Sequence, residues 1–175
     1  MQLTHFMHRP SPAESTVVDN LDQTLWLSNH VTNKAASRLI HMNLSSVQGF
    51  HALADMGGIP GLEAVAPHVC WQRLRQCRDL YRVAGRKQAF RPIPHDPVAA
   101  ESRRMWWMAR NCLAQGKVRR AVEQVEMAEL ILEHAYRAAA ATERNRLVLA
   151  LYQEHIHEIE TARRQFASDV ALFDD

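Results

Sequence analysis

The clearest group of metal-ligand residue types in the sequence lies near its C-terminus, between Glu154 and Glu160. Glu154 and His157 form a Glu-x-x-His pair, which places two ligands on one face of a helix. A site for two bridged metal ions needs this pair twice, with two further carboxylates from other helices. The sequence has no second copy of the pair. We therefore interpret this segment as a solvated helical face and predict no metal site.

The cysteines do not indicate catalysis or metal binding either. Cys70 and Cys77 are one heptad apart and Cys112 lies in another segment, which differs from the paired-ligand spacing of a zinc site. Buried thiols explain them better. No serine or cysteine lies in a nucleophile motif, and no glycine-rich phosphate loop occurs. The sequence therefore predicts a non-catalytic protein without a cofactor.

Charge is unevenly distributed although the chain as a whole carries only +2. Residues 67–120 hold thirteen basic and three acidic side chains, giving +10, whereas residues 121–175 hold five and eleven, giving −6. A basic helical pair packed beside an acidic one would neutralise it, and we favour this interpretation. The alternative is an anionic partner, either nucleic acid or an anionic surface. The candidate contacts for such an anion are Arg73, Arg75, Arg78, Arg82, Arg86 and Lys87.

Two adjacent tryptophans, Trp106 and Trp107, lie among the basic residues Arg103, Arg104 and Arg110. Aromatic and basic side chains occur together at nucleic-acid and anionic-interface contacts. Neighbouring residues on a helix point about 100° apart, so one tryptophan can be buried while the other lies at the rim. We favour this core interpretation over an anionic contact.

The elements that carry these residues are all predicted to be helices. A near-heptad series of apolar and small residues runs through the predicted first helix, 19–55. Its members are Leu21, Leu25, Ser28, Thr32, Ala35, Leu39, Met42, Ser46, Phe50 and Leu53. Because Ser, Thr and Ala replace larger residues at several positions, this face packs weakly and adaptably. Glycines and a proline at 57–61 end the helix.

Further helices follow this break. One is predicted from Leu62 or Pro67 to about Ala89, and another from Pro97 to about Gln115, with Asp96 at its start. Two later apolar stripes, from Ala121 to Ala139 and from Val148 to Phe166, are about half a turn out of phase. Either the chain bends near residues 142–145, or one long helix changes partners there; the alanine run favours continuity.

We therefore predict an all-α fold of long amphipathic helices in an extended bundle or coiled-coil-like assembly. Its parts are a flexible tail (1–16), a helical region (17–91), a proline-rich linker (92–97) and a C-terminal helical region (98–175). The first residues lack the pattern of a secretory signal, and no apolar run approaches the roughly 20 residues of a transmembrane helix. We expect a cytoplasmic protein, and long stripes of this kind favour a homo-oligomer.

Residues 19–88 contain a series of short motifs, namely Asn20-Leu21, Arg38-Leu39, Met42-Asn43-Leu44, Pro67 and the run from Cys77 to Ala84. In these motifs the segment resembles the phasin family, helical proteins that coat polyhydroxyalkanoate storage granules in bacteria. It implies a non-catalytic protein whose amphipathic helices adsorb to the hydrophobic granule surface. The residues that would make this contact are Leu25, Trp26, Leu39, Met42 and Phe50.

Two other functions remain open from the sequence. The same amphipathic helices would suit a cytosolic adaptor or coiled-coil module with a defined protein partner. The basic centre would suit a helical protein that binds nucleic acid weakly.

Overall fold

The computed structural model describes residues 30–84 and 96–171, with side chains at 34–84 and 96–168. All regular elements in these ranges are helices, which confirms the all-α prediction. They are α2 (His30–Met56), α3 (Leu62–Ala84), α4 (Pro97–Ala114), α5 (Val118–Thr142) and α6 (Arg146–Ala171). The predicted tail (1–16), the predicted helix start (19–29) and most of the linker (92–95) lie outside the described residues.

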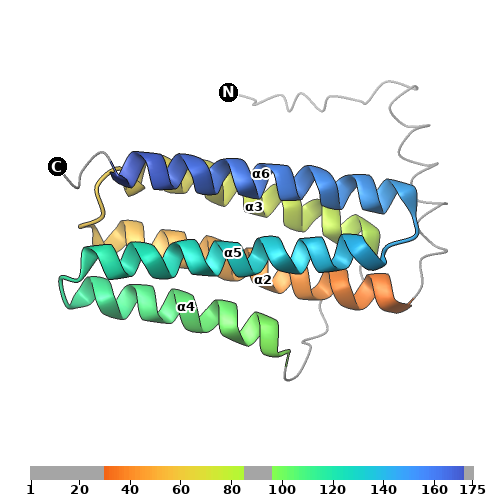
Figure 1. Cartoon of the computed structure of the whole chain (residues 1–175), viewed down its shortest axis with the longest axis horizontal. Coiled ribbons are helices and arrows are strands. Elements are labelled where there is room, and N and C mark those ends of the chain that lie inside the picture. The colour runs from red at the N-terminus through yellow and green to blue at the C-terminus, as the bar shows by residue number, and fades with distance from the viewer. Residues whose placement is uncertain (1–29, 85–95, 172–175) are drawn as a thin grey trace, which may run out of the picture.

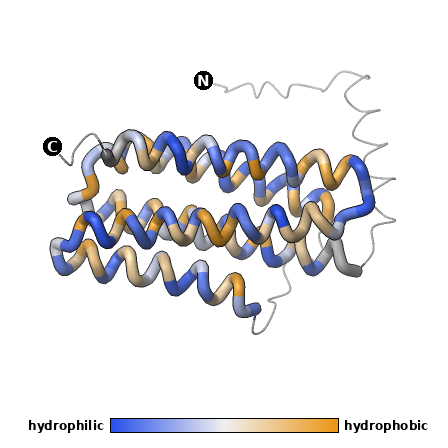
Figure 2. The backbone as a smooth tube through the Cα atoms, viewed as in Figure 1, coloured by the Kyte–Doolittle hydropathy of each residue, from blue (hydrophilic) through white to orange (hydrophobic). Residues whose placement is uncertain are grey.

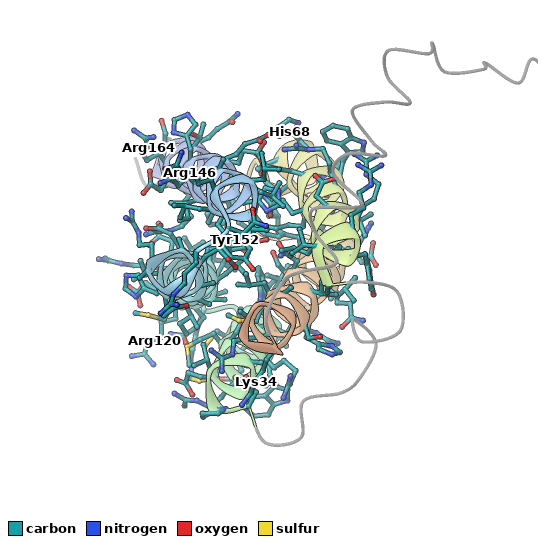
Figure 3. The ribbon with its side chains drawn as sticks, turned by 90° about the vertical axis from the view of Figure 1, so that its right-hand side faces the viewer. Lys34, His68, Arg120, Arg146, Tyr152 and Arg164 are labelled. Atoms are coloured by element: carbon teal, nitrogen blue, oxygen red, sulfur yellow. The ribbon has the colours of Figure 1, made fainter. Side chains whose placement is uncertain are left out.

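The helices pack as a bundle in which successive helices run in opposite directions (Figure 1). α2, α3, α5 and α6 surround the core, and α4 packs on the outside against α2 and α5. Viewed along the bundle, α3 and α6 lie on the side away from α4 (Figure 3). Apolar and polar residues alternate along each helix (Figure 2). Within the described ranges, no helix has both the length and the apolarity needed to cross a bilayer.

The turn between α2 and α3 lies at the predicted break. Gly57 and Gly58 have φ of 67° and 88°, and Gly61 has φ of 75°, a region that glycine enters without steric cost. α3 then begins at Leu62 and continues through Pro67, which lacks a backbone N–H and so removes one hydrogen bond near the helix start.

Asp96 begins α4, as the sequence predicted. Its carboxylate accepts hydrogen bonds from the backbone N–H groups of Val98 and Ala99, both at 3.1 Å, and it pairs with Arg38 of α2 at 2.5 Å. Burial raises the pKa of Asp96, but Arg38 and the two N–H groups outweigh it, so this pKa lies below its usual value. One side chain therefore both caps α4 and fixes it to α2.

The two C-terminal stripes belong to separate helices. α5 ends at Thr142, and the Asn145 side chain accepts hydrogen bonds from the N–H groups of Leu147 (3.0 Å) and Val148 (3.4 Å) at the start of α6. The alternative of one continuous helix is wrong. The phase shift was compatible with both possibilities, and the preference for continuity taken from the alanine run is wrong, because each stripe faces the core only when the chain reverses between them.

The core consists of two apolar clusters. One contains Leu39, Met42, Leu80, Tyr136 and Tyr152 among others, at the end of the bundle where α5 meets α6. The second contains Phe50, Leu62, Trp106, Val125 and Phe166 among others, at the opposite end.

Candidate functional site

A layer of buried polar side chains lies in the bundle between the two apolar clusters. α2 contributes Asn43 and Ser46, α3 contributes Arg73 and Gln76, and α5 contributes Glu129. All five are buried, three of them completely. A polar layer at this depth is the most unusual chemical feature of the described chain, since buried charges are rare unless paired.

Arg73 and Glu129 form the centre of the layer. Arg73 Nη2 donates to Glu129 Oε2 at 2.5 Å, and Ser46 Oγ donates to Glu129 Oε1 at 2.5 Å. Arg73 Nη1 also donates to Gln76 Oε1 at 3.2 Å. The Arg73 Nε has no hydrogen-bond partner within the described chain. This one cluster joins α2, α3 and α5.

A second polar contact joins α2 to α5. Asn43 Nδ2 donates to the Tyr136 hydroxyl at 2.8 Å and to the Leu39 carbonyl at 2.8 Å, while Asn43 Oδ1 has no partner among the described groups. Complete burial raises the pKa of Tyr136 well above its usual value. The phenol therefore stays neutral and acts as a hydrogen-bonding group.

The contact between α3 and α6, which we call the α3–α6 seam, combines apolar residues of the two core clusters with a set of polar contacts. Arg75 pairs with Glu158 and, at 3.4 Å, with Glu154. Gln76 Nε2 donates to Glu158 Oε2 at 2.9 Å. Arg75 of α3 is thus paired with carboxylates of α6, as the neutralisation interpretation expected, although this covers only part of the basic centre.

His155 lies behind this seam and is completely buried. Its ring centroid is 5.4 Å from that of Tyr136, and neither ring nitrogen has a hydrogen-bond partner among the described residues. Burial, together with the charges of Arg75 and Arg73, lowers the pKa of His155 to about 3. Nε2 is 3.8 Å from Asp79 Oδ2. His155 is therefore a neutral core residue.

The segment Glu154–Glu160 divides between core and surface. Glu154 and His157 are exposed, as predicted, whereas the interpretation of the whole segment as solvated is wrong at His155, which faces inward. In the described parts of the chain, no three His, Cys, Asp or Glu side chains come together as a metal site would require. Cys70 and Cys77 are buried free thiols and Cys112 is half-buried.

The residues expected to contact a granule surface are not on the outside of the closed bundle. Leu39, Met42 and Phe50 are 0%, 1% and 2% exposed and belong to the core, where they pack against the other helices. Leu25 and Trp26 lie outside the described residues. Adsorption through α2 would therefore require the bundle to open.

The residues predicted to contact an anion differ in burial and in their ion-pair partners. Arg73 and Arg75 are used inside the bundle, by Glu129 and by Glu158. Arg78 and Arg82 are mostly exposed and lie 3.5 Å and 3.6 Å from Asp79. Arg86 and Lys87 lie outside the described residues. The α3 arginines thus do not form one free cationic surface.

The two tryptophans on α4 separate as adjacent helical positions should. Trp106 is 4% exposed and packs edge-on against Phe50 at 5.0 Å, so the core role holds for this residue. Trp107 is 65% exposed, so one tryptophan is buried and the other is not, as the angle between adjacent positions allowed. Trp71 and Leu74 of α3 are also exposed, and the Arg75 guanidinium lies 5.9 Å from the Trp71 ring centroid.

Comparison with protein-family models, curated proteins and solved structures found no match to this chain.

Sequence reasoning did not recognise Glu129 and Asn43 as members of the polar layer. Glu129 follows Ala128 of an apolar stripe and looks like an ordinary surface acid. The available signal was Ser46, a polar residue between Met42 and Phe50 on the stripe of α2, which would need a hydrogen-bond partner if that face were buried.

Proposed function

We propose that the protein is a non-catalytic, phasin-like protein that adsorbs to hydrophobic storage granules by opening its bundle along the α3–α6 seam. The observation that carries the proposal is the buried polar layer around Arg73 and Glu129, which interrupts the apolar core. Each buried polar atom without a partner costs about 1–3 kcal/mol, and opening returns such atoms to water. The closed bundle is thereby less favoured than one with a continuous apolar core.

The position of α4 determines how the bundle would open. α4 contacts both α2 and α5, so these two helices stay joined on its side of the bundle. α3 and α6 meet on the other side through ion pairs and the Gln76–Glu158 hydrogen bond. Ion pairs that reach solvent contribute little to stability, and α3 and α6 contact each other less extensively than the other packed helix pairs do, so we take this seam as the boundary that opens.

Opening would expose an apolar surface suited to adsorption. The inner face of α2 carries Leu39, Met42 and Phe50, and that of α3 carries Leu80 and Val69. Apolar area transferred from water to a hydrophobic polymer contributes roughly 25 cal/mol per Å², and no shaped pocket is needed. The same residues can thus form the core of the free protein and the contact face of the adsorbed one.

A reversible crosslink across the seam tests this function. Arg75 and Glu154 approach each other at 3.4 Å through long side chains, and Glu154 is largely exposed, so a reagent can reach this edge of the seam. We therefore suggest Arg75→Cys with Glu154→Cys, joined by a short bis-maleimide that contains a cleavable disulfide. The half-buried native thiol is removed with Cys112→Ser. Binding to polyhydroxyalkanoate particles is then measured by sedimentation before and after cleavage.

We expect the crosslinked protein to remain in solution and the cleaved protein to sediment with the particles. The comparison is matched because both samples carry the same substitutions, and circular dichroism checks that both are equally helical. Equal particle binding in the two states would contradict opening at this seam. Absence of binding in both states, and in the wild type, would contradict the granule function and favour the adaptor alternative.

A further inference from the structure

The outer side of α4 carries an aromatic and cationic surface that the bundle core does not use. Arg103, Trp107 and Arg110 lie on one side of the helix at spacings of four and three residues, with Ala100 and Ala114 one turn beyond at either end. We call this set the α4 face. All five side chains are exposed, and the face extends over about 21 Å of helix.

The charges of this face are not neutralised internally. Among the described residues, no carboxylate lies within ion-pair distance of Arg103 or Arg110, whereas Arg104, on the flank, pairs with Glu101 at 2.6 Å. The exposed Lys117 and Arg120 follow shortly after α4, whereas Arg119 pairs with Glu123 at 3.5 Å, and Figure 3 shows Arg120 pointing outward on α5. A positive field therefore covers the α4 corner of the bundle.

Trp107 adds an apolar component at the centre of this field. Its indole is 65% exposed, although the adjacent Trp106 is buried and already supplies the aromatic packing of α4. Indole rings settle at the headgroup level of lipid layers, where one side of the ring is apolar and the other wet. Arginines flanking such a ring on a helix are the pattern of interfacial attachment.

We propose that the α4 face is a contact surface for anionic phospholipid headgroups. The shape of the face favours lipid over nucleic acid. Single-stranded nucleic acid is held in a basic groove with several stacking aromatics, whereas the α4 face is convex and carries one exposed tryptophan. A convex helix with one indole between two cations fits a planar anionic layer. The face lies outside the closed bundle, so its use does not depend on opening of the α3–α6 seam.

Co-sedimentation with lipid vesicles tests the proposal. Phosphatidylcholine vesicles with and without phosphatidylglycerol are compared at ~0.05 M and ~0.15 M salt. The variant Arg103→Gln with Arg110→Gln removes both cations, and Trp107→Ala removes the ring. The matched control, Arg144→Gln with Arg146→Gln, removes the same charge from exposed positions at the α5–α6 turn, and Figure 3 shows Arg146 on the side away from α4.

We expect binding to the anionic vesicles only, weaker at the higher salt. Loss of Arg103 and Arg110 should weaken it by roughly 30-fold, since each cation near an anionic layer contributes about a factor of five. Trp107→Ala should weaken it several-fold, and the control variant should bind like the wild type. The seam-crosslinked protein should still bind, because the α4 face is already exposed.

Three results would overturn the proposal. Equal binding to neutral and anionic vesicles would exclude headgroup recognition. An equal loss in the Arg144/Arg146 control would show that net charge, rather than the α4 face, attracts the protein. Tighter binding of a single-stranded oligonucleotide than of the vesicles, lost on removal of Arg103 and Arg110, would identify the face as a nucleic-acid surface instead.

Discussion

Arg73 and Glu129 form a 2.5 Å ion pair at the centre of the bundle, where Arg73 is completely buried between two apolar clusters. The pair links α3 to α5, and Ser46 extends it to α2. Moving two charges out of water costs several kcal/mol per ion, and their attraction roughly compensates for this. The pair therefore specifies how the helices meet more than it stabilises them.

The first prediction concerns the removal of one partner or both. Glu129→Leu should lower the free energy of unfolding by about 3–5 kcal/mol, because it leaves the Arg73 charge buried without a counterion. Arg73→Met combined with Glu129→Leu should cost much less than the sum of the single changes. Urea unfolding of the four proteins of this double-mutant cycle measures the coupling. Additive costs would contradict the view that the two charges act as a unit.

The second prediction is a dependence of stability on pH that arises from His155. Its pKa is about 3 in the folded protein, against a usual value near 6.5. Between these values the unfolded chain binds one more proton than the folded one. The stability that His155 contributes is therefore complete above about pH 6.5 and falls by up to ~1.4 kcal/mol per pH unit below it. A protonated His155 would be attracted by the Asp79 carboxylate, 3.8 Å away, but repelled by the charges of Arg73 and Arg75.

His155→Leu separates this effect from other titrations. Urea unfolding between pH 7 and about pH 5 should show a smaller decrease in stability for this variant than for the wild type. The exposed His68 provides the control: His68→Leu should keep the wild-type decrease. The same decrease in the wild type and in His155→Leu would show that His155 does not titrate as a buried neutral side chain.

The third prediction concerns the contact between Gly49 and Trp106. A Cβ atom at position 49 would lie 2.1 Å from Cε3 of the Trp106 ring, too close for any side chain. Gly49→Ala should therefore destabilise the protein by roughly 1–3 kcal/mol, although alanine is the better helix former. In a Trp106→Leu background the same substitution should cost far less. Thermal or urea unfolding of the wild type, the two single variants and the double variant measures this difference. An equal loss of stability from Gly49→Ala in both backgrounds would contradict the contact between residue 49 and Trp106.

The sequence by itself determined the helices and most of their ends. Gly57, Gly58 and Gly116 ended or separated helices because positive φ is readily adopted only by glycine, and Asp96 began α4 because its carboxylate satisfies free N–H groups. The phase shift between the two C-terminal stripes marked residues 142–145 as a possible bend, but only the structure decided for a turn over a continuous helix. These signals are local, since each depends on residues within one or two helical turns.

Which residues face which neighbour was decided only by the tertiary structure. The soft stripe of α2 could have been an external adsorption face, but Leu39, Met42 and Phe50 are buried because three other helices supply complementary surfaces. In the same way, Arg73 became a core residue because Glu129, 56 positions away, meets it on α5. Trp106 and Trp107 differ in exposure because α2 and α5 cover one side of α4 only. Helical periodicity determines the angle between side chains on one helix, whereas the burial of each side chain depends on which residues of the other helices pack against that side.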